Sequence, residues 1–335
     1  MSLTTDHPDV VIEHHLDEAH ERGLAEDVLD GLTRPFKELP PKHFYDERGC
    51  ELFDRITALP EYYPTRAERA ILELQAQAIV AATGAAELVE LGSGSATKTR
   101  VLLDAMRDAP HRPGLSRYVP FDVAESVVRA SAEALVDEYP GLRVHGVVGD
   151  FERHLDRIPA PVAGEPRLVA LLGGTIGNFA PGSRRRLLRE IAALLGPSDH
   201  LLLGTDLVKD ATVLEAAYDD AAGVTAEFNR NLLRVVNREL DADFPLEDFE
   251  HVAFFDRRHE WIEMRLRARR ACSVHVESLG LHVELAAGEE IRTEISAKFT
   301  RARVAEDYAA AGLALAGWHT DAQGHFALSL ARPLT

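Results

Sequence analysis

The chain has 335 residues and an ordinary apolar content of 46%, so it is long enough to bury a full core in one elaborated domain or in two. No apolar run approaches the roughly 20 residues that span a bilayer, and the N-terminus is polar and acidic, which predicts a soluble, cytoplasmic protein without a membrane partner. The net charge of −18 would repel a phosphate backbone, so we expect a small or cationic ligand and no nucleic acid.

The first part of the chain divides into two patterns. The first sixty residues look helical, and we expect them to pack with a later insertion. From 86 to 207, short apolar runs alternate with helical patterns near 96–109, 124–138 and 183–196. This alternation predicts an α/β fold with a parallel, doubly wound sheet.

The second part interrupts this alternation and then closes the sheet. Residues 208–296 read as helices followed by antiparallel strands, which predicts an inserted α+β subdomain. After a helix, two apolar runs flank "DAQG", which has the composition of a hairpin turn. We therefore assign 63–207 and 297–335 to one domain, and 1–62 and 208–296 to a second.

The strongest local signal is "ELVELGSGSATKTR", in which a buried strand ends at Glu90 and a turn through Gly92 and Gly94 leads into a helix. Glycines there let the backbone approach a ligand closely. A dinucleotide fingerprint would place a third glycine where this chain has Thr97, so the pattern favours S-adenosylmethionine over NAD. A plain tight turn remains the alternative.

Two further strands end in acidic residues. Asp122 follows the second strand, where a carboxylate can accept both ribose hydroxyls, and Asp150 follows the third, where it can accept from the adenine amino group while Phe151 lies against the ring. A helix-capping role for Asp150 is the alternative. Three strand-end signals in the right order predict a methyl-donor site.

The loop after the fourth strand, "LLGGTIGNF", carries Gly173, Thr175 and Asn178. Ligands in such sheets sit beyond the carboxyl ends of the strands, so this loop should face the transferable methyl group, unless it is only a glycine-rich turn. Asn178 offers an amide that can both donate and accept. No HExxH, paired CxxC or calcium-loop spacing occurs, so we expect no metal.

Several segments together resemble the S-adenosylmethionine-dependent L-histidine Nα-methyltransferases of ergothioneine biosynthesis. The resemblance implies a Rossmann-like class I methyltransferase sheet with an inserted α+β substrate-recognition subdomain, and Nα-trimethylation of L-histidine to hercynine. The segments that carry it are "LPPKHFYDERGCELFDRITALPEYYPTRAE", "LVELGSGSATKTR", "PFDV", "GDFE", "GGTIGN", "LLLGTDLVKD", "AYDDAAGVTAEFNRN", "IEM" and "AAGEEIRTEISAKF".

The resemblance also implies residue roles. The methyl donor is held by Gly92, Lys98, Asp122, Asp150 and Phe151. Tyr62, Asn178 and Gly173 serve catalysis, and the histidine is bound by Tyr62, Asn178, Tyr218, Glu294 and Ser296, with Phe53, Thr175 and Met264 beside it.

Two of these assignments carry open alternatives. Glu294 and Ser296 lie two apart on a predicted strand, so both can point to one face and meet the imidazole nitrogens. From the residues alone, Glu294 also reads as an exposed strand residue, and Met264 as plain packing.

The tandem Tyr62 and Tyr63 precede a proline, which biases Tyr63 toward an extended backbone. Neighbouring side chains in an extended stretch point to opposite sides, so only one phenol can face a common pocket. We predict that Tyr62 faces histidine and that Tyr63 packs inward, with Thr65 and Glu68 forming a capping box at the next helix.

Three other functions compete with histidine methylation. The same fold could methylate another amino acid such as tryptophan, which the presence of Glu294 and Met264 disfavours. A noncatalytic S-adenosylmethionine-binding regulator is disfavoured by the complete substrate set, and an NAD oxidoreductase by Thr97. We expect a monomer.

Overall fold

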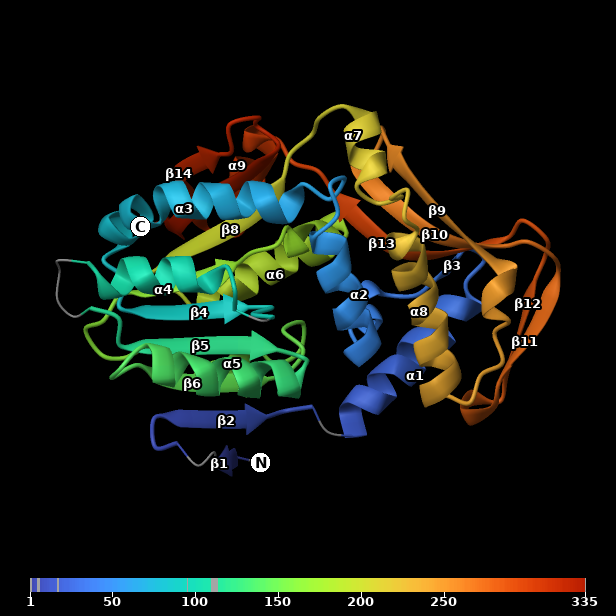
Figure 1. Cartoon of the computed structure of the whole chain (residues 1–335), viewed down its shortest axis with the longest axis horizontal. Helices are drawn as coiled ribbons and strands as arrows, with labels where there is room; N and C mark the ends of the chain where they lie inside the picture. The colour runs from blue at the N-terminus through green and yellow to red at the C-terminus, as the bar shows by residue number, and fades with distance from the viewer. Residues whose placement is uncertain (1, 5–6, 17, 95, 110–113, 335) are drawn as a thin grey trace. The chain divides into compact units, whose positions relative to one another are not determined.

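The computed structural model describes residues 2–4, 7–16, 18–94, 96–109 and 114–334. The chain divides into two units, which we describe separately (Figure 1). Unit 1 comprises Met1–Leu16, Pro64–Leu207 and Phe299–Thr335, and unit 2 comprises Asp17–Tyr63 and Val208–Lys298.

The helices and strands of unit 1 are β1 (Ser2–Thr4), β2 (Val10–His14), α3 (Pro64–Thr83), β4 (Glu87–Leu91), α4 (Thr99–Arg107), β5 (Arg117–Asp122), α5 (Glu125–Glu138), β6 (Arg143–Val148), η2 (Leu155–Arg157), β7 (Arg167–Leu171), η3 (Thr175–Asn178), α6 (Pro181–Ala193), β8 (His200–Asp206), α9 (Arg301–Ala310), β14 (Leu313–Thr320) and β15 (Phe326–Pro333).

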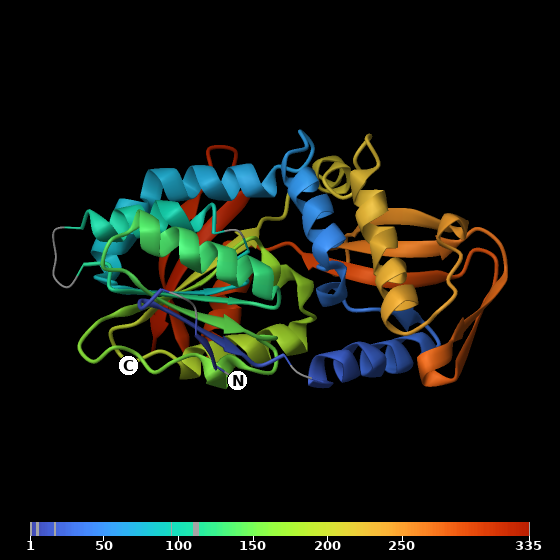
Figure 2. The ribbon, with the colours of Figure 1, turned by 60° about the horizontal axis from the view of Figure 1, so that its bottom comes forward.

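The described strands of unit 1 form one nine-stranded sheet in the order β1-β2-β6-β5-β4-β7-β8-β15-β14. The strands from β2 to β8 run parallel, and β15 and β14 close the sheet as an antiparallel hairpin, which confirms the predicted α/β sheet and its closing hairpin. Helices α3, α4 and α5 cover one face, and α6 lies on the other (Figure 2). The loops after β4, β5, β6 and β7 therefore meet at the edge formed by the carboxyl ends of the strands.

The two central strands, β4 and β7, are buried along their whole length. Buried Glu87 on β4 accepts from Arg167 of β7 at 2.5 Å and from Arg117 of β5 at 2.6 Å. A buried charge is tolerated when it is paired and hydrogen-bonded. This cluster joins three neighbouring strands at their first residues, at the end of the sheet opposite to the loops described above.

The start of the chain differs from the sequence prediction. Strand β2 pairs in parallel with β6, and β1 pairs antiparallel with β2. Val10 and Ile12 are buried while Val11 is exposed, which is the period-two alternation of a strand. The prediction that the first sixty residues are helical and pack with the insertion was therefore wrong for residues 2–4 and 10–14. The apolar run "VVI" is too short to distinguish a strand from a helix.

The helices and strands of unit 2 are α1 (Glu18–Thr33), β3 (Lys37–Glu38), η1 (Pro41–Phe44), α2 (Glu47–Thr57), α7 (Ala211–Ala216), α8 (Val224–Glu239), η4 (Leu246–Asp248), β9 (Phe249–Asp256), β10 (Trp261–Ala268), β11 (Cys272–Val276), η5 (Glu277–Leu279), β12 (Leu281–Leu285) and β13 (Glu290–Ala297).

Unit 2 is built on a four-stranded sheet in the order β3-β13-β10-β9, with a separate β11–β12 hairpin. Helix α8 packs on the sheet and on α2, and their apolar side chains form a core separate from that of unit 1. The helices and antiparallel strands expected over 208–296 are present. No helix among the described residues is long and apolar enough to cross a membrane.

Ile12→Ala should lower the free energy of unfolding by about 2–5 kcal/mol, because it removes a fully buried branched side chain of β2. Val11→Ala is the matched control on the same strand, where the side chain is 38% exposed, and should change stability by about 0.5 kcal/mol or less. Denaturant unfolding measures both. Equal effects would mean that β2 does not pack on the sheet in solution.

Candidate active site

The turn after β4 adopts the geometry that its glycines allow. Gly92 and Gly94 have φ of 72° and 49°, in the left-handed region that favours glycine. The Gly94 N–H donates to Asp122 Oδ2 at 2.9 Å, and the Gly92 N–H to the Phe121 carbonyl at 2.8 Å. Burial raises the pKa of Asp122, and the bond from Gly94 opposes this rise. The turn and the end of β5 thus form one hydrogen-bonded edge; Ser95 lies outside the described residues.

Lys98, which follows this turn, is linked to the loop after β7 through Glu68, to which the sequence prediction gave a different role. Buried Glu68 of α3 accepts from the Lys98 ammonium with one carboxylate oxygen and from the Gly173 N–H at 2.8 Å with the other. Helix α3 begins at Pro64, so Thr65 lies inside the helix and the predicted capping box was wrong. The Glu68 side chain turns instead toward the loops of the sheet.

The segment after β6 holds the predicted adenine residues. Asp150 Oδ1 accepts from the Glu152 N–H at 2.8 Å, and the Asp150 N–H donates to His154 Nδ1 at 3.1 Å. The Phe151 ring lies between Phe121 and Phe179, with centroids 6.5 Å and 6.0 Å away. The carboxylate of Asp150 therefore stabilises its own turn and caps no helix, because η2 begins after His154. The Phe151 ring contacts Phe121, near the carboxyl end of β5.

The loop after β7 contains Gly173 and Gly174, both with φ above 70°, followed by the 3₁₀ turn η3. The Thr175 hydroxyl donates to the Leu172 carbonyl at 3.0 Å. Asn178 ends η3 and is half-buried. The predicted donor residues and this loop thus belong to unit 1, at the edge formed by the carboxyl ends of its strands.

In unit 2, a bulge in β13 decides which side chains face the core. Met264 pairs with Glu294 and Arg265 with Arg292, so Thr293 is an extra residue opposite β10. Thr293 and Glu294 are consecutive and both buried, whereas a regular strand would place Glu294 on the outer face with Arg292. Glu294, Ser296 and Met264 come together on the buried face, as the resemblance implies.

Tyr218 and Lys298 complete this buried face. The Tyr218 hydroxyl lies 2.8 Å from Ser296 Oγ, and the Lys298 ammonium donates to both hydroxyls, at 3.1 Å and 2.9 Å. Lys298 is fully buried, and its ammonium lies 4.6 Å from the centroid of the Tyr218 ring. Burial raises the pKa of Glu294 to about 7, and the charge of Lys298 opposes this rise.

A hydrogen-bonded chain fixes the backbone of Tyr218. The Thr293 hydroxyl donates to Asn229 Oδ1 at 2.6 Å, and Asn229 Nδ2 lies 2.8 Å from His251 Nδ1. His251 Nε2 lies 2.8 Å from the Tyr218 carbonyl, which can only accept, so the proton of the neutral ring is on Nε2. Burial lowers the pKa of His251 and so favours that neutral ring.

Both tandem tyrosines pack on the core of unit 2, but they differ in burial. Tyr62 is buried, with its ring edge-on to Phe53 at 6.1 Å and to Tyr218 at 6.3 Å. Tyr63 is half-buried, and its hydroxyl accepts from Lys209 at 2.6 Å. The expectation that Tyr63 is the inward-packed member was wrong, because Tyr62 fills the core position.

Sequence reasoning assigned no role to Tyr45 and Lys298, and it gave Glu68 only the capping role that the structure contradicts. The Tyr45 ring contacts Phe53 edge-on at 5.6 Å, and burial raises its pKa well above the usual range, with the charge of Glu294 adding to the effect. Lys298 could have been found, because it continues the period of two that joins Glu294 and Ser296. Glu68 lies far along the chain from Lys98 and Gly173 and gives no such signal.

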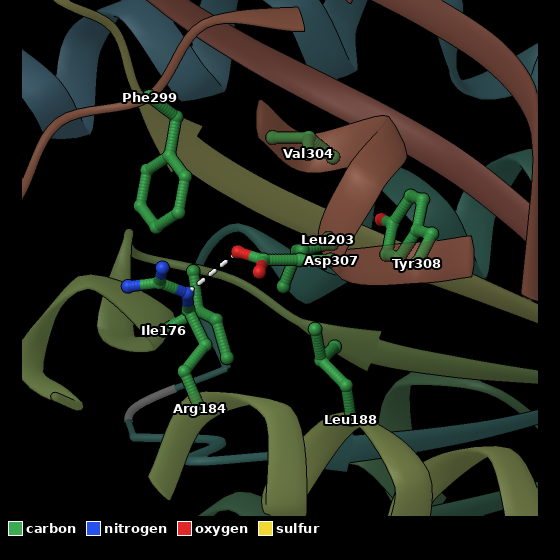
Figure 3. A pocket seen from close by; sticks show the side chains of 8 residues that line it. All are labelled: Ile176, Arg184, Leu188, Leu203, Phe299, Val304, Asp307 and Tyr308. Carbon is green, nitrogen blue, oxygen red and sulfur yellow. Dashed lines mark hydrogen bonds and ion pairs between the residues drawn. The ribbon is translucent and has the colours of Figure 1, made fainter. Parts of the chain in front are cut away.

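Metal-binding clusters and pockets are the other features of the described residues that bear on a site. Within the described part of the chain, no group of three or more His, Cys, Asp or Glu side chains could hold a metal ion. A small pocket in unit 1 holds the buried Arg184–Asp307 ion pair, 2.8 Å long, and contains no predicted site residue (Figure 3). Its lining residues are Ile176, Arg184, Leu188, Leu203, Phe299, Val304, Asp307 and Tyr308.

Comparison with known proteins gives consistent matches along the chain. The family model described as "Histidine-specific methyltransferase, SAM-dependent" matches residues 24–333. Histidine N-alpha-methyltransferase of Mycolicibacterium smegmatis is 56% identical over 308 residues, covering 92% of this chain and 94% of that protein. The protein of the same name from Mycobacterium tuberculosis is 52% identical over 323 residues, covering 96% and 99%. Ergothioneine biosynthesis protein 1 of Neurospora crassa is 34% identical over 204 residues, covering 60% of this chain and 23% of that protein.

The raised pKa of Glu294 predicts a pH-dependent difference in stability. The pKa rises from 4.5 to about 7 on folding, so the stabilising contribution of the protonated group is fully present below pH 4.5 and is lost as the pH rises through about 7. Without ligands, Glu294→Gln should therefore be more stable than the wild type at pH 8, by up to about 3 kcal/mol, and nearly equal to it near pH 4.5. Thermal melts at both pH values measure the gap.

Glu284→Gln is the matched control for this comparison, because Glu284 lies exposed on β12 of the same unit. Its melting temperature should follow the wild type at both pH values. A gap for Glu294→Gln that stays constant between pH 4.5 and pH 8 would show that the Glu294 carboxyl is not protonated by burial.

Proposed function

The chain belongs to the histidine-specific, S-adenosylmethionine-dependent methyltransferase family, and from this we propose that it methylates the α-amino nitrogen of L-histidine three times in succession. The product is hercynine, and the reaction is the first step of ergothioneine biosynthesis, the pathway named in the N. crassa relative. S-adenosylmethionine is the co-substrate and supplies the sulfonium-activated methyl group, so no covalent intermediate with the protein is needed.

The observation that carries this proposal is the buried carboxylate of Glu294, next to the Ser296–Tyr218 hydroxyl pair and opposite Met264. A buried carboxylate is costly unless a partner satisfies it, and the imidazole N–H of histidine is such a partner. A side chain without this N–H would leave the carboxylate unpaired, which gives strong discrimination. Because the pKa of Glu294 lies near 7, close to that of an imidazole, the two groups can share one proton.

We assign donor binding to residues of unit 1. Asp122 accepts from the ribose hydroxyls, Asp150 accepts from the adenine amino group, and Phe151 lies against the adenine ring. Gly92 keeps the turn after β4 free of a side chain, and the Lys98 ammonium attracts the carboxylate of the donor. The fit is supported by the position of all five residues in the segments that follow β4, β5 and β6.

We assign positioning of the amine to the predicted histidine-binding residues. The Tyr218 hydroxyl and the Asn178 amide donate to the histidine carboxylate, and Tyr62 stands beside the amine. The aromatic rings of Tyr62 and Phe53, in contact with each other, favour the cation that grows as methyl groups are added. Gly173 and Thr175 are small residues in the loop after β7, so backbone carbonyls of this loop can approach the amine. Orientation should supply much of the rate enhancement.

The cellular setting follows from the same proposal. We place the protein in the cytoplasm as a monomer, with unit 1 as the donor-binding domain and unit 2 as the substrate-recognition domain. The boundaries of units 1 and 2 differ from those of the two domains expected from the sequence mainly in residues 1–16, which belong to unit 1 through β1 and β2.

Incubation with S-adenosylmethionine and each of the twenty amino acids separately, followed by mass spectrometry, tests the proposal. Histidine should gain up to three methyl groups, and the other nineteen amino acids should give no product. Trimethylation of tryptophan in place of histidine would transfer the assignment to another amino acid. Donor binding without any methylated product would support the regulator alternative and contradict catalysis.

Asp122→Ala should weaken S-adenosylmethionine binding by roughly 1.5–3 kcal/mol, the range for hydrogen bonds to a charged group. Histidine affinity should change less. Asp137→Ala, at an exposed carboxylate of α5 in the same unit, is the control and should leave donor affinity unchanged. Calorimetry measures both ligands, and unchanged donor affinity in Asp122→Ala would remove this residue from the site.

A further inference from the structure

Lys298 is a fully buried cation to which neither the resemblance nor the proposed roles give a task. It follows β13 directly, and its backbone N–H donates to the Glu260 carbonyl at 2.7 Å. That bond fixes the end of the strand, and the side chain continues along the buried face after Glu294 and Ser296. Keeping an ammonium away from water is expensive, so its position requires compensating partners.

The partners of Lys298 are the hydroxyls of two proposed histidine ligands. Its ammonium donates to the Tyr218 hydroxyl at 3.1 Å and to Ser296 Oγ at 2.9 Å. A hydroxyl that accepts from an ammonium is polarised and becomes a stronger donor to its next partner. The positive charge is therefore transmitted through Tyr218 to any group that its hydroxyl contacts.

The charge of the substrate explains why such a cation is needed. At neutral pH, histidine carries a carboxylate, and the amine must be neutral to attack, so the reactive form is an anion beside the carboxylate of Glu294. Two buried anions close together repel strongly in a low-dielectric interior. Lys298 is placed to compensate them, since it lies next to the hydroxyl proposed for the carboxylate and its charge acts on Glu294.

We propose that Lys298 is a positioning residue that supplies the counter-charge for the substrate carboxylate, acting through the hydroxyls of Tyr218 and Ser296. This inference rests on the proposed function, because it takes histidine as the ligand of that face. According to this inference, Lys298 makes the site prefer an amino acid over the corresponding amine without a carboxylate. Glu294 makes the site prefer the histidine side chain.

Histamine is the matching probe, because it is histidine without the carboxylate. Lys298→Met, which removes the charge at similar length, should weaken histidine binding at least tenfold and change histamine binding by less than threefold. The ratio of histidine affinity to histamine affinity should therefore fall. Lys298→Gln keeps a hydrogen-bond donor but no charge. It should lower this ratio in the same way, and it replaces the methionine variant if that variant does not fold. Calorimetry, with and without saturating S-adenosylhomocysteine, measures the affinities, and initial rates should show the loss in KM more than in kcat.

Lys37→Met is the control, because Lys37 lies on β3 of the same sheet and pairs with Glu289 away from the hydroxyls. It should leave both affinities unchanged. Equal weakening of histidine and histamine in the Lys298 variants would make the residue a packing element and overturn the inference, as would unchanged histidine affinity. If the wild type formed no methylated histidine, the proposed function itself would fail; if it did, and the ratio survived in the variants, only this inference would fail.

Discussion

The proposed histidine site depends on one irregularity, the bulge that adds Thr293 to β13 opposite Met264. A regular strand would turn Glu294 and Ser296 to the face of Arg292, where Arg292 and Arg265 form ion pairs with the buried Glu263. The extra residue reverses the alternation beyond it, so a carboxylate, a hydroxyl and an ammonium are buried in succession. Bulges of this kind re-aim side chains next to active sites at the cost of ladder hydrogen bonds.

Thr293, Ser296 and Lys298, which face inward at and after the bulge, belong to one connected hydrogen-bond network. Thr293 begins the chain of hydrogen bonds through Asn229 and His251 to the Tyr218 carbonyl, and the Tyr218 hydroxyl returns to β13 at Ser296 and Lys298. A fully satisfied network is rigid, while each missing partner leaves a costly buried group. The network therefore fixes Tyr218 at its backbone carbonyl and at its hydroxyl, and the buried Glu294 carboxylate is not part of it.

The sequence predicted the parts of the fold that depend on repeated patterns, and the proposed donor residues lie at the ends of those strands. Gly92, Asp122 and Asp150 each follow a strand of an alternating α/β region, so their common edge follows from topology. The β1–β2 hairpin was missed because three apolar residues give no period. Glu68 was missed because its partners, Lys98 and Gly173, are about 30 and 105 residues away along the chain.

The burial of Glu294 and Ser296 on one face agrees with the roles that the resemblance implies, but it does not follow from alternation. Glu294 and Ser296 share a face in any strand, but which face it is depends on a bulge that no residue of "EIRTEISAK" signals. Alternation alone groups Glu294 with Glu290 and Arg292, which favours an exposed position. The tyrosine pair is a second example. Extended geometry predicts that Tyr62 and Tyr63 point to opposite sides, but it does not predict which of the two is buried.

The central claim is that the Glu294 carboxylate, turned inward by the bulge, binds the imidazole ring of the substrate. A crystal structure with L-histidine and S-adenosylhomocysteine bound tests this claim most directly. The distance to measure joins a Glu294 carboxylate oxygen to the nearest ring nitrogen of the bound histidine. We predict about 2.7–3.2 Å, a direct hydrogen bond. An imidazole more than about 4 Å from Glu294, with its nitrogens bonded to other residues, would contradict the account.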